Sequence, residues 1–298
     1  MAHGPALQRR VDECVGSNCC PVSLSIKVMV LLSHNRSVFT RSALHGTLVK
    51  CRFNALVLSC LLTASEMTHA QSPAYLDVGL FSSAKISENL PAGWEPMTFS
   101  KIEQHTDYSL VYAGDTVVVK AVSNQSASGL TRAVSIDPAK YPVIQWQWKV
   151  DNILQKGDVA NKDGDDYSAR IYITFALVQD RAGYLEQLKH EAAKLIFGQD
   201  VPYRAISYIW GSNSPAGTMV ANPYTDRVMM FVVEGGDEKV REWVTEKRNV
   251  HEDYKQAFGE EAPMISGVAI MTDTDNTRES AIAWYGDIIF TNDTAGSY

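Results

Sequence analysis

Beyond residue 60 the sequence has no cysteine, because all five cysteines lie in the first 60 of its 298 residues. This absence excludes cysteine nucleophiles, thiolate zinc sites and iron–sulfur clusters from the rest of the chain. It also suits folding in an oxidising compartment, where unpaired thiols would form wrong disulfides. The cysteine-free body is therefore typical of an exported domain.

Histidine is also scarce, and several catalytic motifs are missing. Beyond residue 70 the chain keeps only His105, His190 and His251, with no paired metal-ligand spacing. There is no Gly-x-Ser-x-Gly elbow, no phosphate-binding glycine loop and no dinucleotide fingerprint. These absences argue against zinc catalysis, a serine triad and nucleotide use.

Positive charge is in short supply. After residue 70 the chain has 20 lysines and arginines against 31 aspartates and glutamates, a formal net charge of −11. Such a surface repels a phosphate backbone, so we expect no nucleic-acid partner. It suits cation binding, or it serves solubility alone.

Residues 49–70 have the order of a signal peptide. The basic Lys50 and Arg52 precede an apolar run at 53–64, and Ala70 gives a small residue just before the cut. The run is too short to cross a bilayer. We therefore expect export to the periplasm or the exterior of a bacterial cell, with no integral membrane span in the mature form.

The remaining boundaries follow from this segment. A lipoprotein signal at Cys60 is the less favoured alternative, because the apolar run continues past the cysteine. We interpret residues 1–48 as an extension upstream of the true translation start. Residues 71–90 are expected to be a linker, and residues 91–292 a single domain.

The body is rich in runs of β-branched and aromatic residues separated by turn signals. The expected strands are 109–112, 117–122, 142–150, 169–178, 205–210, 227–233, 265–271 and 281–290. Trp146 and Trp148 share one strand face, and we favour a core layer over an exposed stacking platform. The pattern predicts an all-β fold with minor helices, a two-sheet antiparallel β-sandwich of the jelly-roll, lectin or carbohydrate-binding-module kind.

Two helices are expected between these strands. Residues 181–197 carry an apolar stripe that ends at Gly198. A second helix at 250–258 follows a capping pattern at Asn249, with a glutamate three residues on, and ends before Gly259.

An acidic loop at 157–170 separates two expected strands. Closely spaced aspartates with a glycine between them are how loops supply oxygen ligands to hard cations. The sequence therefore predicts a calcium site at Asp163, Asp165 and Asp166, although the spacing is not that of an EF-hand. The alternative is a solvated loop in which Asp166 pairs with Arg170.

A second acidic segment contains Asp273 and Asp275, which would share one side if the strand at 265–271 continues. Paired carboxylates can perform acid–base work on a glycosidic bond. The segment differs from the Glu-x-Asp-x-x-Glu strand of sandwich glucanases. It is equally a loop that offers oxygen ligands or forms Asx turns.

A third segment combines aromatic and polar side chains of the kind that line sugar-binding grooves. Its candidate ligand-binding residues are Trp210, Asn222, Tyr224 and Arg227, together with Arg170. The alternative for 222–227 is a simple turn. A fourth segment, in which Arg248 precedes Asp253, fits a structural ion pair equally well.

Several long strings resemble those of a bacterial secreted family, the domain of unknown function DUF3047. They are residues 93–96, 146–148, 162–172, 222–227, 268–276 and 284–287. The resemblance spans about residues 90–290 and implies one exported domain. It implies no activity.

Three functional hypotheses remain. The first is an exported protein that binds a glycan or another small ligand, with calcium in the acidic loop. The second is a carbohydrate-active hydrolase or lyase that uses the paired aspartates. The third is a structural envelope protein whose acidic loops only keep it soluble. We favour the first, because acidic loops are common and catalytic pairs are rare.

Overall fold

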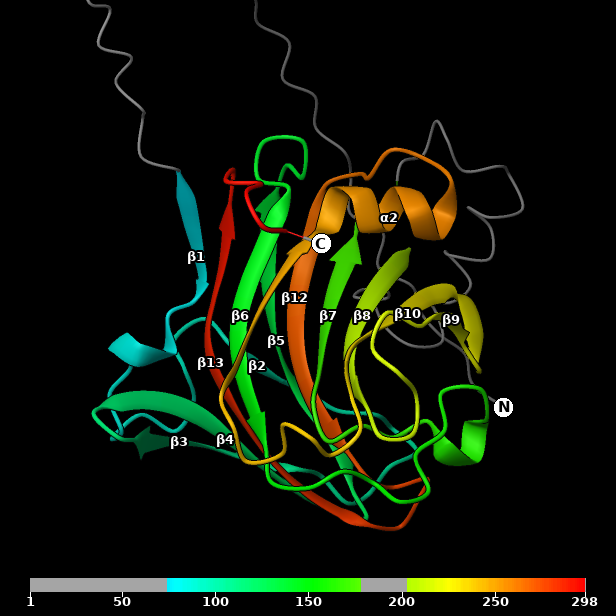
Figure 1. The fold of residues 1–298 in the computed structure, drawn as a ribbon. Helices are drawn as coiled ribbons and strands as arrows, with labels where there is room; N and C mark the ends of the chain where they lie inside the picture. Colours follow the sequence, from blue (N-terminus) through cyan, green and yellow to red (C-terminus); the bar gives the residue numbers. More distant parts are fainter. Residues whose placement is uncertain (1–73, 178–202, 298) are drawn as a thin grey trace, which may run out of the picture. The chain divides into compact units, whose positions relative to one another are not determined.

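The computed structural model describes residues 74–177 and 203–297, and these form two facing β-sheets (Figure 1). The strands of the six-stranded sheet are β1 (Tyr75–Gly79), β3 (Asp107–Ala113), β4 (Thr116–Asn124), β6 (Val143–Val150), β11 (Val244–Asn249) and β13 (Ser280–Thr291). Their order is β11-β6-β13-β4-β3, and β1 also pairs with β13.

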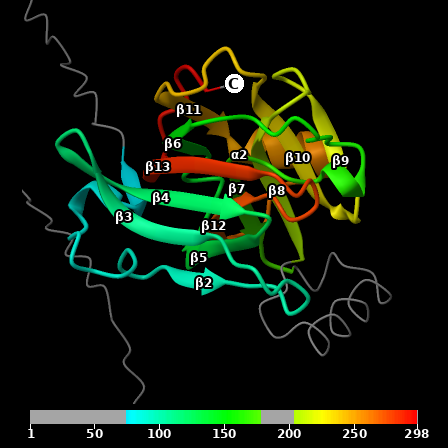
Figure 2. The same ribbon diagram turned by 90° about the horizontal axis from the view of Figure 1, so that it is seen from below.

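The second sheet has seven strands in the order β2-β5-β12-β7-β8-β10-β9. They are β2 (Glu95–Met97), β5 (Ala127–Ile136), β7 (Arg170–Phe175), β8 (Arg204–Gly211), β9 (Met219–Asn222), β10 (Thr225–Gly235) and β12 (Ile265–Asp273). Every pairing in the two sheets is antiparallel except that of β8 with β10. Figure 2 shows the two layers from below. The predicted two-sheet β-sandwich is confirmed.

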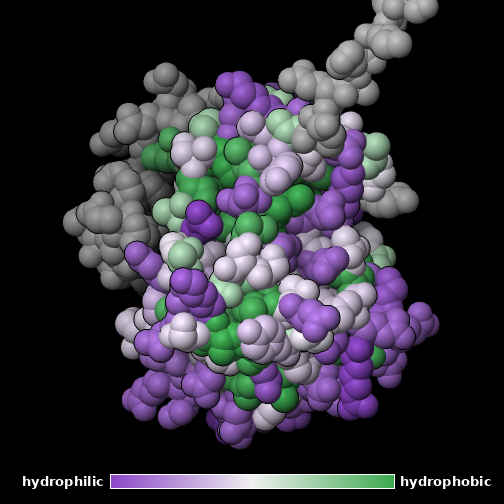
Figure 3. All heavy atoms as spheres, turned by 90° about the vertical axis from the view of Figure 1, so that its left-hand side faces the viewer, coloured by the Kyte–Doolittle hydropathy of each residue, from purple (hydrophilic) through white to green (hydrophobic). Residues whose placement is uncertain are grey.

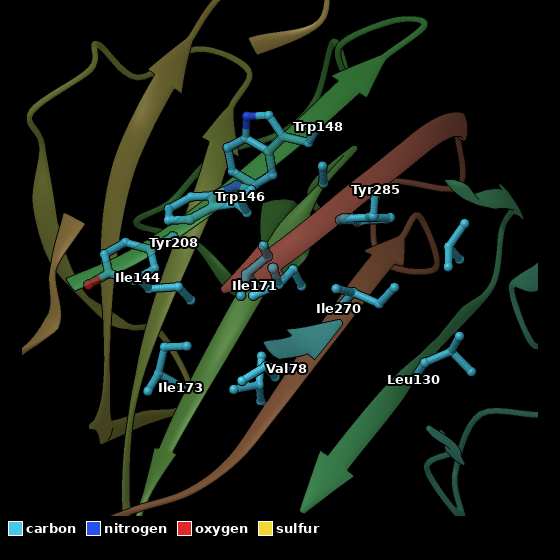
Figure 4. Close-up of a cluster of buried hydrophobic side chains, with 14 of the residues drawn as sticks. Val78, Leu130, Ile144, Trp146, Trp148, Ile171, Ile173, Tyr208, Ile270 and Tyr285 are labelled. Carbon is cyan, nitrogen blue, oxygen red and sulfur yellow. The ribbon is translucent and has the colours of Figure 1, made fainter. Parts of the chain in front are cut away.

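Alternating side chains of both sheets fill the space between them, as Figure 4 shows for β6 and β13 against β5, β7, β8 and β12. Trp146 and Trp148 of β6 are fully buried, which confirms the predicted core layer. Trp146 stacks on Tyr208 of the opposite sheet with ring centroids 5.2 Å apart, and Trp148 lies 5.9 Å from Trp210. These aromatic contacts join the two layers directly.

The predicted helix at α2 (Val250–Phe258) is also confirmed. The side chain of Asn249 accepts a hydrogen bond from the amide of Glu252 at 3.1 Å, and Gly259 ends the helix in the left-handed region with a φ of 73°. Among the described residues no helix is long and apolar enough to span a membrane. The helix predicted at 181–197, the signal peptide at 49–70 and the extension at 1–48 lie outside the described residues.

Some described elements were not expected. Strand β1 lies within residues 71–90, where the sequence suggested only a linker, and pairs with β13. Val78 of this strand and the following Phe81 are each 1% exposed, so they belong to the core. Strand β5 was missed because its small and polar residues carry little hydrophobic signal.

Candidate functional site

Three separate loops meet near the turn between β12 and β13, at the bottom of Figure 1. The acidic loop that contains η2 (Lys162–Gly164) precedes β7, and the β9–β10 hairpin lies beside it. Asn222 of the hairpin donates to Asp165 at 2.9 Å, and the hydroxyl of Tyr224 donates to the carbonyl of Lys162 at 3.3 Å. Asn276, after β12, donates to the same carbonyl at 2.9 Å. Three of the segments singled out in the sequence therefore form one site.

The pairing of β7 with β12 brings two of these loops together. The strands are antiparallel with Arg170 opposite Met271, so the start of β7 lies beside the end of β12. The guanidinium of Arg170 donates to Asp273 Oδ2, and the amide of Tyr167 donates to Asp273 Oδ1 at 3.3 Å. Arg170 Nη1 also lies 3.9 Å from Asp165 Oδ1. Arg170 and Asp273 are 4% and 1% exposed, so the pair is buried.

Asp166 is fully buried at the centre of the site. Its Oδ2 accepts two hydrogen bonds from Thr277, from the amide at 2.6 Å and from the hydroxyl at 2.7 Å. Its Oδ1 has no hydrogen-bond partner among the described residues, and neither has Oδ1 of Asp165. A buried oxygen without a partner is costly, and a water or a bound ion would satisfy it.

Asp166, Asp273 and Asp275 form the acidic cluster of the site. Each of them has a carboxylate oxygen within 4.8 Å of those of the other two. Asp275 is partly exposed, whereas the other two are buried. With Asp165 there are four carboxylates in this region, against the guanidinium of Arg170, which pairs with Asp165 and Asp273, and the ammonium of Lys156, which donates to the carbonyl of Thr277 at 3.0 Å, so negative charge is in excess.

Burial and this excess charge disfavour the ionised carboxylates. Burial raises the pKa of Asp273 well above its ordinary value, and Asp166, Asp165 and Asp275 add to the rise against the lowering effect of Arg170. Burial also raises the pKa of Asp166, although its hydrogen bonds from Thr277 lower it. A divalent cation would supply the positive charge that the cluster lacks.

The cluster fits a cation better than it fits acid–base catalysis. Both oxygens of Asp273 accept hydrogen bonds, and Asp273 and Asp166 expose almost no surface. A general acid or base must reach a substrate atom within hydrogen-bonding distance. Asp275 is the only one of the three with substantial access to solvent. Asp273 and Asp275, the predicted acid–base pair, thus lie together with Asp166, but two of these three carboxylates are buried.

The three predicted metal ligands, Asp163, Asp165 and Asp166, do not all lie in the acidic cluster. Asp166 belongs to the acidic cluster, and Asp165 lies beside it through Arg170. Asp163 is exposed in η2 and is not a member of the cluster. Asp273 and Asp275, which were singled out as an acid–base pair, are the residues that complete it. Thr277 was missed, because only the fold brings it to Asp166.

The predicted ligand-binding residues do not form one groove. Trp210 is 1% exposed, and its indole donates to the carbonyl of Gly236 at 3.0 Å, so its ring offers no face to a ligand. Arg170 is buried in the acidic site. The guanidinium of Arg227 lies 5.9 Å from the ring of Tyr203.

Asn222 and Tyr224 do meet, in the loops around the acidic cluster. The amide of Tyr224 donates to the side chain of Asn222 at 3.0 Å. Tyr224 is 57% exposed, and Lys162 Nζ lies 5.0 Å from its ring. Tyr224, rather than Trp210, is thus the accessible aromatic residue of this region.

The chain belongs to the family described as protein of unknown function (DUF3047), whose model matches residues 92–289. That region contains the whole acidic cluster and the three loops that surround it. The expected family membership is confirmed. A search of the curated proteins finds no match.

Two solved structures are among the matches to this chain. One is the glycoside hydrolase domain of Endo-D, Spr0440, from Streptococcus pneumoniae R6, at 6% identity and a TM-score of 0.29. The match covers 67% of this chain but only 22% of that structure. The other is the cellulose-induced protein Cip1, at 12% identity and a TM-score of 0.27, with 66% of this chain and 90% of that one covered. Likeness at this level carries no functional argument.

Proposed function

We propose that this protein is an exported, non-catalytic binding protein in which a calcium ion holds three loops together at one end of the β-sandwich, and that its ligand is a glycan. The observation that carries the proposal is the acidic cluster. Asp166, Asp273 and Asp275 bring carboxylate oxygens within 4.8 Å of one another, and Oδ1 of the buried Asp166 has no partner among the described residues.

The ligand set favours a hard cation. Calcium takes six to eight oxygen ligands, with carboxylates and carbonyls in flexible geometry. The cluster offers three carboxylates, with no cysteine or histidine among them. Counted with Asp165, Arg170 and Lys156, whose ammonium donates to the carbonyl of Thr277, the ionised site has a formal charge of −2, which a divalent ion would neutralise. Magnesium is the poorer fit, because it demands strict octahedral geometry and keeps several of its waters.

Export is consistent with such a site. The signal-like segment at 49–70 and the cysteine-free body support it. Extracellular calcium modules commonly bind with dissociation constants of about 10⁻⁴ to 10⁻³ M, so the site need not be tight. Its role would be to fix the loops and not to react.

The test is unfolding of the full chain in calcium and in chelator. At a hundredfold excess over its dissociation constant, calcium should raise the free energy of unfolding by about 2.7 kcal/mol. Asp275→Asn should abolish the increase. Asp163→Asn is the matched control, because it removes the same charge from an exposed position beside the cluster and should keep the increase. Equal stability with and without calcium would overturn the cation site.

The binding role needs a separate measurement. Calorimetry against a panel of neutral and acidic polysaccharides should detect binding by the calcium-loaded protein, with no release of reducing ends over time. Steady release that Asp275→Asn abolishes would favour a carbohydrate-active enzyme instead. Calcium binding without any glycan binding would leave a structural envelope protein as the better description.

A further inference from the structure

The outer face of the six-stranded sheet carries a groove that takes no part in the acidic site. Strand β6 alternates, so that Gln145, Gln147 and Lys149 point away from the core while the tryptophans point into it. Figure 3 shows the side of the molecule on which β1 and β3 lie, with apolar surface bordered by polar side chains. The groove has a volume of about 440 Å³. It is lined by Ala113, Thr116, Val118, Gln145, Trp146, Gln147, Trp243, Gly286, Asp287 and Ile289.

Glycine makes the floor of the groove possible. Gly286 lies where β13 is irregular, between Tyr285 and Ile288. A Cβ atom at Gly286 would lie 3.1 Å from Cβ of Gln147, closer than ordinary van der Waals contact. A side chain at this position would therefore crowd the groove at its base.

Aromatic rings and lysines alternate along one row beside the groove. Trp284 of β13 is opposite Lys149 of β6 on one side and Lys120 of β4 on the other. Lys149 Nζ lies 4.3 Å from the ring of Trp284 and 5.4 Å from that of Trp243, and Lys120 Nζ lies 5.9 Å from Trp284. Trp243, just before β11, is 40% exposed and also lines the groove.

The two lysines have no carboxylate partner within the described residues. Neither Lys120 nor Lys149 forms an ion pair with any residue in the described ranges, 74–177 and 203–297. Asp287, the carboxylate among the groove residues, accepts hydrogen bonds from the amide of Ser82 at 2.8 Å and from its hydroxyl at 2.6 Å. Asp287 is the one charged side chain among the described residues that line the groove, and the two lysines beside the groove, unpaired in a strongly acidic body, are the positive charges that would attract an anionic ligand.

We propose that this groove binds a polysaccharide that carries carboxylate groups. The exposed ring of Trp243 offers a flat surface for a sugar ring, and the amides of Gln145 and Gln147 offer hydrogen bonds to hydroxyls. Lys149 and Lys120 would pair with the carboxylates of the ligand. This inference rests on the proposed glycan-binding function and assigns it a site and a substrate class.

The test uses oligogalacturonates and their methyl esters, which differ in charge but share one backbone. Calorimetry with the full chain in chelator removes any contribution from the cation site. The acid form should bind, with an affinity that falls as salt rises, and the ester should bind more weakly. Trp243→Ala should lower the affinity by about tenfold or more, as expected for a central aromatic contact. Lys149→Gln should lower it several-fold and reduce its salt dependence.

Tyr112→Ala is the matched control, because Tyr112 is an exposed aromatic residue on the same sheet, 68% exposed, and does not line the groove. It should leave the affinity unchanged. Glycan binding that survives both Trp243→Ala and Lys149→Gln would overturn the groove but not the proposed function. Equal binding of acid and ester would overturn the carboxylate assignment. Absence of oligogalacturonate binding, alongside binding of a neutral glycan, would overturn the substrate class alone.

Discussion

Two buried aspartates in this fold, Asp253 and Asp166, differ in whether the protein supplies partners for their carboxylate oxygens. Asp253 in α2 accepts hydrogen bonds from Arg248 at 2.5 and 3.0 Å and from the hydroxyl of Tyr208 at 2.7 Å, so one carboxylate meets one guanidinium. Asp166 lies in a cluster with Asp273 and Asp275 in which Arg170 pairs only with Asp273, and Oδ1 of Asp166 has no hydrogen-bond partner among the described residues. The first site is complete within the protein. The second leaves buried carboxylate oxygens without a partner among the described residues, and the proposed calcium ion would complete it.

The two sites also differ in how the chain assembles them. Arg248 and Asp253 are five residues apart, at the junction of β11 and α2. Arg170 and Asp273 are 103 residues apart and meet through strand pairing. A short-range pair forms wherever its helix forms. The long-range cluster joins loops from distant parts of the chain, and a cation of the kind proposed above would add to the hydrogen bonds that already connect them.

The largest effect should come from breaking the balanced pair. Arg248→Met leaves the buried carboxylate of Asp253 without its counter-charge and should lower the free energy of unfolding by about 3 kcal/mol. Denaturant unfolding would measure the loss, which should be the same in calcium and in chelator. Arg241→Met is the control, because its side chain is 74% exposed and its pair with Asp151 contributes little. Equal losses in both variants would contradict the contrast between buried and exposed pairs.

The unbalanced cluster should respond with the opposite sign. In chelator, Asp275→Asn removes one of several like charges around Asp166 and Asp273, so it should raise the free energy of unfolding by about 2 kcal/mol. In calcium the same variant should be less stable than the wild type, because it lacks a ligand. A variant that is less stable in both conditions would show that Asp275 only supports the loop.

The sequence was sufficient for the fold class and for eight of the thirteen described strands, but not for the parallel pairing of β8 with β10 or for the site. Alternating patterns correctly placed the strands around Trp146 and Trp148, because core-facing residues recur every second position. The same period puts Tyr208 and Trp210 on one inner face of β8, which explains why Trp210 is buried and not in a ligand groove. Strand β5 could not be identified in this way, since it has few large apolar residues.

The members of the acidic cluster could be predicted only in part. Local spacing in the acidic loop drew attention to Asp166, which lies in the cluster, but it gave no reason to separate it from the exposed Asp163. Asp273 and Asp275 were noted as a separate pair. They meet Asp166 because β7 pairs with β12. Neither segment alone predicts which distant strand it will pair with.

A third acidic site is intermediate between the two. Glu246 of β11 and Glu234 of β10 lie close together, with one lysine, Lys239, whose Nζ lies 2.6 Å from Glu234. Trp148 donates to Glu246 at 3.3 Å. Burial raises the pKa of Glu246 to about 7, and the charge of Glu234 adds to the rise. Two carboxylates therefore lie beside one lysine, and Glu246 is the one whose pKa is raised.

The smallest effect should come from this pair and should depend on pH. Glu246 in the folded protein keeps its proton up to a pKa of about 7, whereas in the unfolded chain it releases it near its ordinary value of 4.5. The folded state therefore holds more protons in this window, so stability should fall as the pH rises from about 4.5 to 7. Glu246→Gln carries no charge and can still donate to Glu234. It should flatten this slope and exceed the wild type in stability by about 1 kcal/mol above pH 7, a value reduced by partial solvent screening.

Urea unfolding at pH 5, 6, 7 and 8 would measure the slope, with Glu242→Gln as an exposed control that should leave it unchanged. If Glu246→Gln kept the full slope, the proton would have to reside elsewhere, and the acidic cluster around Asp166 would be the first site to examine.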